Sequence, residues 1–219
     1  MPEHGGRSAH DLRATAHAKR RYDRNARFYH YADRQIRREW RLLALAEARG
    51  AVLELGVGTG GNLPLYDPHE VSRVTGVDFS AAMLAGAYGR TPSVPCDLRL
   101  MDVQALEFPD QSFDTVLATC VFCTVPDPLQ GLREARRVVR PDGRVVLLEH
   151  VRVPGALGCL QDVLNPLTLW LMGENINRRT LDYVRMAGLL PERVDEVAGG
   201  LVQLIVAKPP PRSRGELML

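Results

Sequence analysis

The sequence lacks any long uninterrupted apolar run. Nowhere in its 219 residues do about 18 consecutive apolar residues occur, and a transmembrane helix needs roughly that many. The amino-terminal stretch MPEHGGRSAH also lacks the apolar core of a secretory signal. These two absences predict a protein that is made and kept in the cytoplasm.

Cysteine is scarce as well. The four cysteines lie in or beside apolar segments, at Cys96, Cys120, Cys123 and Cys159. This placement fits reduced, packed thiols better than a disulfide framework. Cys120 and Cys123 form a C-x-x-C pair, but no second pair of ligands accompanies it, so we expect no metal site.

Lysine is nearly absent. Lys19 and Lys208 are the only lysines among 28 basic residues, and arginine binds phosphates and carboxylates in a fork geometry. The net charge is +2, but residues 1–49 carry twelve basic and six acidic residues, a net +6, so the remainder carries a net −4. A basic segment joined to an acidic body predicts an anionic surface as partner.

Three regions follow from the pattern. Residues 12–48 show amphipathic helical spacing with an interruption near His30, so we expect a basic helical arm or lid over residues 1–49. An α/β domain is expected over residues 50–208. The proline-rich residues 209–219 are expected to form a disordered tail.

The middle of the chain alternates short apolar runs with helical windows. Strands are predicted at residues 51–55, 73–78, 97–101, 113–119 and 144–149. Helices are predicted between them at residues 62–66, 80–88 and 128–139. This alternation is typical of a parallel sheet that is covered by helices on both faces.

The pattern changes after the fifth predicted strand. Residues 156–173 are apolar with a break at Pro166, and the sequence leaves open whether they form core, a pocket wall or a contact with lipid. A helix follows in INRRTLDYVRMAGLL. Two last strands, 192–197 and 201–207, are joined by Gly199 and Gly200, which predicts a tight antiparallel hairpin.

The stretch AVLELGVGTGGN follows the first predicted strand and matches two cofactor patterns. Gly56, Gly58 and Gly61 spell the dinucleotide pattern G-x-G-x-x-G, while E-x-G-x-G-x-G begins at Glu54 and includes Gly60. Asp78 ends the second strand and could bind ribose in either case. The glycines alone therefore decide nothing.

Three other features favour S-adenosylmethionine over a dinucleotide. Glu54 lies where a carboxylate suits the cationic end of this cofactor and would repel a pyrophosphate. Asp102 follows the third strand and could accept a hydrogen bond from an adenine amine, with Val103 against the ring. The sheet also ends in a hairpin rather than in a second mononucleotide-binding half.

The sequence resembles the class I S-adenosylmethionine-dependent methyltransferases. The resemblance covers about residues 20–208, and the motifs that carry it are VLELGVGTGGN, VTGVDFSAAML, MDVQAL, FDTVLATCVFCTVPDP and LREARRVVRPDGRVVLLEHV. It implies a doubly wound, Rossmann-like sheet of seven strands, mostly parallel with an antiparallel C-terminal hairpin, preceded by N-terminal amphipathic helices.

The resemblance also implies roles for single residues. Glu54 would hold the methionine ammonium, Gly56, Gly58 and Gly60 would line its path, and Asp78 would bind the ribose. The other residues implied for the cofactor are Asn62, Phe79, Met83 packed on adenine, Asp102 at its amine, Val103, and Thr119 with Cys120 on the methionine side.

Shorter motifs narrow the choice of methyl acceptor. RRYDRNARFYHYAD resembles a segment of the ubiquinone-biosynthesis-like group, from which His30 departs. CTVPDP, LLEHV and GENINRRT resemble bacterial phosphatidylethanolamine N-methyltransferases and the group that acts on alkyl thiols. We expect N-methylation of phosphatidylethanolamine and its methylated intermediates. A thiol or quinone precursor is the alternative acceptor, and a cofactor-binding scaffold without chemistry is a further class.

The lipid hypothesis assigns the remaining residues. His150 would accept the proton of the amine, and Tyr22 and Tyr29 would face the amine. Tyr31 would contact substrate at the membrane, and Arg178 with Arg179 would clamp the lipid phosphate. Arginines between positions 13 and 41, together with Phe28, Tyr29, Tyr31 and Trp40, would meet a membrane surface peripherally.

A nucleic-acid substrate is not expected. The fourth predicted strand ends in TCVF and lacks the N-P-P-aromatic arrangement that adenine amino methylation uses. The NPL at Asn165 comes after the fifth strand, and the acidic body offers no broad basic groove. The oligomeric state stays open.

Overall fold

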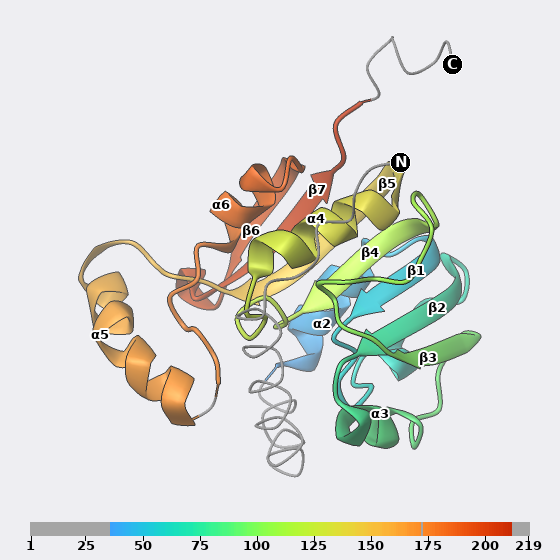
Figure 1. Cartoon of the computed structure of the whole chain (residues 1–219), viewed down its shortest axis with the longest axis horizontal. Helices are drawn as coiled ribbons and strands as arrows, with labels where there is room; N and C mark the ends of the chain where they lie inside the picture. The colour runs from blue at the N-terminus through green and yellow to red at the C-terminus, as the bar shows by residue number, and fades with distance from the viewer. Residues whose placement is uncertain (1–35, 172, 212–219) are drawn as a thin grey trace.

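A seven-stranded sheet forms the centre of the protein. The computed structural model describes residues 36–171 and 173–211 (Figure 1). The strand order is β3-β2-β1-β4-β5-β7-β6. The strands are β1 (Gly50–Leu55), β2 (Val71–Asp78), β3 (Cys96–Leu100), β4 (Phe113–Thr119), β5 (Val139–His150), β6 (Leu190–Val197) and β7 (Val202–Lys208).

The directions of the strands confirm the predicted sheet. Strands β1 to β5 pair in parallel. Strand β7 lies between β5 and β6 and runs antiparallel to both, with Val197 opposite Val202 at the hairpin end. The sheet is therefore mostly parallel with an antiparallel C-terminal hairpin, as the family resemblance implies.

Side-chain caps begin two of the five described helices, α3 (Ala81–Ala87) and α4 (Pro128–Val138). The other three are α2 (Arg38–Leu45), α5 (Gly155–Leu171) and α6 (Thr180–Met186). The Ser80 hydroxyl accepts the Met83 N–H at 3.3 Å, and the Asp127 carboxylate accepts the Gln130 N–H at 3.0 Å. These side chains satisfy N–H groups that the first helical turn leaves free.

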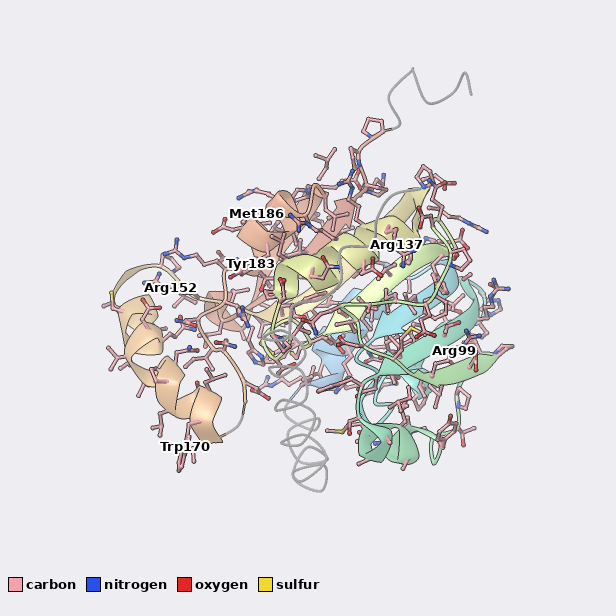
Figure 2. The ribbon with its side chains drawn as sticks, viewed as in Figure 1. Arg99, Arg137, Arg152, Trp170, Tyr183 and Met186 are labelled. Carbon is pink, nitrogen blue, oxygen red and sulfur yellow. The ribbon has the colours of Figure 1, made fainter. Side chains whose placement is uncertain are left out.

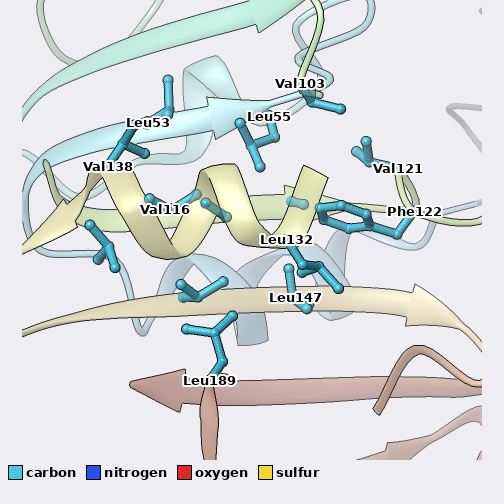
Figure 3. Packing of buried hydrophobic residues seen from close by; sticks show 14 of the residues in the cluster. Leu53, Leu55, Val103, Val116, Val121, Phe122, Leu132, Val138, Leu147 and Leu189 are labelled. Carbon is cyan, nitrogen blue, oxygen red and sulfur yellow. The ribbon is translucent and has the colours of Figure 1, made fainter. Parts of the chain in front are cut away.

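Two apolar clusters cover the two faces of the sheet. One joins strand residues such as Leu53 and Val116 to Leu132 of α4 and to Leu189 after α6 (Figure 3). The other packs α2 and α3 on the opposite face, against Val52 and its neighbours. Burial on both faces is what continuous apolar strands need, so the sheet is doubly wound.

Three local predictions were wrong. The helix predicted at 62–66 is only a 3₁₀ turn, η1 (Leu63–Leu65), since Tyr66 already has extended backbone angles. Helix α5 runs through Pro166 without a break. Asp162, four residues earlier, is exposed, so water can bond to the carbonyl that loses its N–H partner.

The third correction concerns the terminal hairpin. Its connection is not a two-residue turn but the four residues 198–201, which include the 3₁₀ turn η2 (Ala198–Gly200). Ala198, Gly199 and Gly200 have positive φ angles of 52°, 66° and 86°. Three consecutive residues in the left-handed region exceed what a two-residue turn contains.

The fold brings the ends of five strands together. In a parallel sheet the carboxyl ends share one edge, where α/β proteins bind their ligands. Strands β1, β2, β3, β4 and β5 end there. The residues at or just after these ends are Gly56, Asp78, Met101, Cys120 and His150.

Candidate cofactor and acceptor site

The loop after β1 adopts a conformation that glycine favours. Gly56, Gly58 and Gly60 have φ angles of 59°, 55° and 76°. A Cβ atom on Gly56 would meet the Val121 side chain at 2.7 Å, whereas on Gly58 it would meet nothing closer than the Gly56 oxygen at 3.9 Å. The open side of Gly58 is therefore available to a ligand that approaches the backbone.

Asp78 ties this loop to the next strand. Its carboxylate accepts the Gly58 N–H and the Ser80 N–H, both at 2.9 Å. The side chain is buried at the end of β2. Phe79 follows it half-buried, and Met83 on α3 is buried. Asp78 therefore lies directly beside the open glycine.

Glu54 belongs to a buried hydrogen-bond network. Its two carboxylate oxygens accept the Asn62 amide and the Tyr66 hydroxyl, each at 2.8 Å. Asn62 is fully buried and also donates to the Thr119 hydroxyl at 3.2 Å. Burial and the Glu54 carboxylate raise the pKa of Tyr66 well above its usual value, so this phenol stays protonated as a donor.

Arg41 completes this network and corrects a prediction. The arginine was expected on a face that meets the membrane, but it is 6% exposed and donates from Nη1 to the Asn62 oxygen at 2.8 Å. Trp40, also expected at the membrane, packs partly buried against the core cluster of that face. Arg37 and Arg38 are exposed, so the basic face there is narrower than predicted.

Asp102 and Val103 follow β3 at the same edge. The Asp102 carboxylate accepts the Gln104 N–H at 2.9 Å, and the buried Gln104 side chain accepts the Asp127 N–H at 3.0 Å. Val103 is buried in the cluster that contains Phe122. Asp102 is half-buried beside this apolar wall, an arrangement that suits an aromatic base.

Cys120 and His150 meet at the ends of β4 and β5. The Cys120 sulfur lies 3.5 Å from Nδ1 of His150, and Cys120 has a φ of 55°. Burial, followed by the nearby Glu149 carboxylate, raises the thiol pKa, so this cysteine is no thiolate. Burial also lowers the pKa of His150 below its usual 6.5, which favours the neutral imidazole.

Glu149 is a site residue that our sequence reasoning missed. It is fully buried, and Oε1 accepts the N–H groups of Val121 and Phe122 at 2.9 and 3.0 Å. Within the described part of the chain, Oε2 has no hydrogen-bond partner. Burial raises the pKa of Glu149 from 4.5 to about 7. The residue thus holds the loop that follows β4.

The segment after α5 packs against the loop that follows β4. Asn175 donates from its backbone and its side chain to the Cys123 oxygen, at 2.9 and 3.1 Å, and Arg178 donates to the Val125 oxygen at 3.0 Å. The Glu174 carboxylate helps to raise the pKa of Cys120 and Cys123. Arg179 is exposed and precedes α6. Glu174 was also missed from the sequence.

Two buried donors in this region have no partner among the described residues. They are Nε of Arg178 and the hydroxyl of Thr180. With Oε2 of Glu149 they are the buried side-chain nitrogen and oxygen atoms that lack a hydrogen-bond partner among the described residues. Buried groups of this kind normally bond to water or to a ligand.

Other predicted features lie elsewhere. Tyr22, Tyr29 and Tyr31 fall outside the described residues. Residues 36–171 and 173–211 contain no group of three His, Cys, Asp or Glu residues that could hold a metal ion. A cleft of about 500 Å³, lined by Arg133, Arg136, Pro141 and neighbouring residues, lies at the opposite edge of the sheet, away from this site.

The fold and the site define a class of protein. A glycine loop after β1, a carboxylate at the end of β2 and a polar residue after β3 form a nucleotide-cofactor site on a doubly wound sheet. The carboxylates Glu54 and Asp78 suit a cofactor with a cationic end and ribose hydroxyls. A pyrophosphate beside Glu54 would be repelled.

Comparison with known proteins identifies the family. The family described as "Methyltransferase domain" matches residues 53–147. A demethylmenaquinone methyltransferase from Thermus thermophilus is 35% identical over 158 residues, which are 70% of this chain and 72% of that protein. The chain therefore belongs to the S-adenosylmethionine-dependent methyltransferases, and S-adenosylmethionine is the cofactor that its site fits.

Two further relatives differ in their named substrates. A phosphatidylethanolamine N-methyltransferase from Cereibacter sphaeroides is 44% identical over 130 residues, 57% of this chain and 63% of that protein. The human thiol S-methyltransferase TMT1B is 37% identical over 120 residues, 50% of this chain and 46% of that protein. The chain thus spans less than two thirds of these two relatives.

A solved structure supports the fold. The S-adenosylmethionine-dependent methyltransferase from Mesorhizobium loti superposes with a TM-score of 0.63 at 20% identity. The match covers 76% of this chain and 95% of that one. At this identity the likeness concerns the fold alone.

Proposed function

We propose that the protein transfers methyl groups from S-adenosylmethionine to the amine of phosphatidylethanolamine and of its methylated intermediates. The observation that carries this proposal is the juxtaposition of His150, Glu174 and Arg178 around the loop after β4. A base, a carboxylate and a guanidinium at one edge of the site match an acceptor that has both an ammonium and a phosphate. The relative from Cereibacter sphaeroides, named for this lipid, adds support.

The cofactor roles in this proposal follow the geometry. Asp78 binds the ribose hydroxyls from the end of β2, and Gly58 offers its open backbone beside it. Glu54 acts on the methionine ammonium through the Asn62 network. Asp102 meets the adenine amine, with Val103 and Met83 against the ring. Phe79, Thr119 and Cys120 complete the wall, together with Gly56 and Gly60.

The acceptor roles use opposite charges. The Glu174 carboxylate attracts the ammonium of the headgroup, and the exposed Arg179 with Arg178 binds its phosphate. Glu174 is half-buried, and this burial raises the pKa of its carboxyl group. An ion pair with a bound ammonium would therefore be stronger here than on the open surface.

One proton must leave the amine before it reacts. When bound, S-adenosylmethionine supplies an electrophilic methyl group on a sulfonium. His150 accepts the proton of the ammonium, and its lowered pKa keeps the imidazole neutral and ready to do so. The lone pair of the freed amine then forms the new N–C bond as the S–C bond breaks.

A small-molecule acceptor is the alternative. Relatives named for demethylmenaquinone and for thiols align with the same part of the chain. A quinone precursor or an alkyl thiol also loses a proton on methylation, so His150 would serve in either reaction. Such acceptors have no phosphate, and Arg178 and Arg179 would then have no anion to bind.

The test is methyl transfer to vesicles. Labelled S-adenosylmethionine is incubated with the protein and with phosphatidylcholine vesicles that contain or omit phosphatidylethanolamine, and the lipids are analysed by mass spectrometry. We expect mono- and dimethylated headgroups only when phosphatidylethanolamine is present. No lipid product, with labelled product formed on a thiol or a demethylmenaquinone, would favour the alternative. Cofactor binding without any product would indicate a scaffold.

A further inference from the structure

Helix α5 turns its apolar side chains outward. Its exposed large apolar residues are Leu157, Leu160, Val163, Leu164, Leu167, Leu169, Trp170 and Leu171, with exposures that reach 75% at Val163 and 74% at Trp170. All except Leu169 fall on one stripe about 140° wide at 3.6 residues per turn. Figure 2 shows Trp170 at the lower end of the helix, where its side chain points downward, away from the sheet.

The opposite side of α5 is polar and forms hydrogen bonds with the rest of the protein. Gln161 is buried, accepts the Val153 N–H at 2.8 Å, and donates to the oxygens of Val151 and Ile176 at 3.0 and 2.9 Å. Asn165 accepts the Ile176 N–H at 2.9 Å. A helix of a protein in water buries its apolar face and exposes its polar face, so α5 has the reverse orientation.

Further polar contacts at Asp162 fix this orientation of the helix. Asp162 is the only charged residue of α5, and it pairs with Arg152 at 2.8 Å. Asn177 donates to the same carboxylate at 3.0 Å. Rotation of α5 by 180° about its own axis would break these bonds. Exposed apolar patches of this kind mark contacts with a partner or a membrane. We therefore expect one of these two to cover the stripe.

We propose that α5 lies in the interface of a phospholipid bilayer, with the stripe toward the acyl chains, and so holds the acceptor site at the membrane surface. This inference builds on the proposed lipid acceptor. The helix has 17 residues, or about 25 Å, which suits a helix lying about 5–10 Å deep in the interface. In the described residues no helix is long and apolar enough to cross a membrane.

The composition of the stripe supports lipid as the occupant. It presents aliphatic side chains without a charge, and Trp170 stands near its end, where a tryptophan suits the headgroup level. A bilayer can cover such a stripe without shape complementarity.

Two other occupants fit less well. A second copy of α5 would offer a footprint of roughly 250 Å², because the helix is only about 25 Å long and 10 Å wide, whereas a stable interface buries about 800 Å² on each partner. Residues 1–35 contain twelve charged residues and only six large apolar ones, Met1, Leu12, Tyr22, Phe28, Tyr29 and Tyr31. A segment of this composition matches an aliphatic stripe poorly.

The position of α5 connects the membrane to the site. The segment that follows the helix donates from Asn175 to the Cys123 oxygen and from Arg178 to the Val125 oxygen. Both oxygens belong to the loop that follows β4. A bilayer that holds α5 would therefore also hold the acceptor site close to the lipid headgroups.

The first test is flotation with vesicles of phosphatidylcholine and phosphatidylglycerol that contain no phosphatidylethanolamine. We expect the full chain to float and the triple variant Leu160→Ser, Val163→Ser, Leu167→Ser to partition at least tenfold less. These side chains are 50%, 75% and 52% exposed, so thermal unfolding should change little. The matched control, Met186→Ser with Leu190→Ser, replaces apolar residues of similar exposure outside α5 and should float like the parent.

The second test uses tryptophan fluorescence. In the variant Trp40→Phe, Trp170 is the only tryptophan of the chain. We expect its emission to shift to shorter wavelength when the same vesicles are added, and to be quenched by brominated acyl chains. Flotation of the triple variant like the parent, with no shift of Trp170, would overturn the proposal. So would a dimer that the triple variant loses, found without vesicle binding.

These experiments test membrane binding by α5 separately from the proposed methylation of phosphatidylethanolamine. Vesicles without phosphatidylethanolamine report membrane contact whatever the acceptor is. If the parent does not float but methylates phosphatidylethanolamine dispersed in detergent, the role of α5 fails and the proposed function stands. If it floats through α5 but methylates no lipid, the membrane contact stands and the acceptor is wrong.

Discussion

Asn62 donates its side-chain amide to the Glu54 carboxylate at 2.8 Å, in a part of the molecule closed to solvent. The same side chain accepts from Arg41 at 2.8 Å. One neutral amide thus separates a buried carboxylate from a buried guanidinium and bonds to both. The orientation of Glu54, and with it the methionine end of the proposed cofactor site, depends on Asn62.

Replacement of Asn62 by Ala should therefore destabilise the protein and weaken binding of S-adenosylmethionine. Both buried charges lose a partner, and an unsatisfied buried group costs about 1–3 kcal/mol. Urea unfolding and calorimetry measure the two effects. Asn177→Ala removes an amide that bonds to the exposed Asp162, and it should change stability by less than about 0.5 kcal/mol. Unchanged stability of Asn62→Ala would show that the network is not structural.

Asp78→Ala should weaken S-adenosylmethionine binding by more than about tenfold, a free-energy loss of roughly 1.4 kcal/mol or more. The change removes the proposed ribose ligand and the acceptor of the Gly58 N–H. Calorimetry gives the dissociation constant directly. The exposed Asp97, which pairs with Arg99 on β3, provides the matched control Asp97→Ala. Equal affinity in the Asp78 variant and the parent would remove the ribose assignment.

Much of the fold could be predicted because the first five strands are short, largely apolar runs. Five runs of this kind, separated by helical windows, specify a parallel sheet, and the structure has its strands at those places. Details that depend on single backbone angles could not be predicted. The loop at Ala198 and the passage of α5 through Pro166 are examples, since both depend on tertiary surroundings.

Three residues of the site, Glu149, Arg41 and Glu174, were not predicted from the sequence as site residues. Glu54 was selected for its place in the glycine pattern and for its charge. A carboxylate at the end of an apolar strand also needs a partner, and this argument applies equally to Glu149 after four apolar residues. Arg41 could have been recognised as buried, because it shares a helix face with Ala44 and Leu45. Glu174 gave no such signal, since its position depends on how the segment after α5 packs.

The outward face of α5 could not be predicted either. Its apolar spacing is that of an ordinary core helix, and a sequence does not say which side of a helix the protein attaches to. The attachment at Gln161 and Asn165 decides this, through bonds to residues that follow the helix. Polar residues in an apolar helix are therefore the place to look for a reversed orientation.

Glu149 should make stability depend on pH in a way that Glu149→Gln abolishes. The folded protein raises the pKa of this carboxyl from 4.5 to about 7. The folded state thus holds the proton more tightly than the unfolded state, so the stabilisation is fully present below pH 4.5 and is lost as pH rises through 7. The free energy of unfolding of the parent, relative to the variant, should fall by roughly 3 kcal/mol over that range.

Unfolding by urea at a series of pH values measures this difference. Glu149→Gln keeps an acceptor for the Val121 and Phe122 N–H groups, so the variant should still fold. A difference between parent and variant that stays constant from pH 4.5 to 7.5 would contradict a raised pKa at this position.

His150→Asn should lower kcat on the order of 100-fold, the usual contribution of a general base. In the parent, burial lowers the pKa of His150 below 6.5. The neutral imidazole therefore predominates at and above pH 6.5, so kcat should be level there and should fall at lower pH as the ring gains a proton. In the variant, this fall of kcat at low pH (the acid limb of the profile) should disappear, together with most of the rate.

The pH profile separates this role from a structural one. A histidine that only packs against Cys120 would change stability or KM when replaced, and it would leave the acid limb of kcat in place. His69 is exposed and precedes the amino end of β2, at the opposite edge of the sheet from His150, so His69→Asn should keep both the rate and the acid limb. A His150→Asn variant that retains the limb would assign the proton to another acceptor, and Glu149, whose pKa of about 7 also lies in this range, would be the next residue to test.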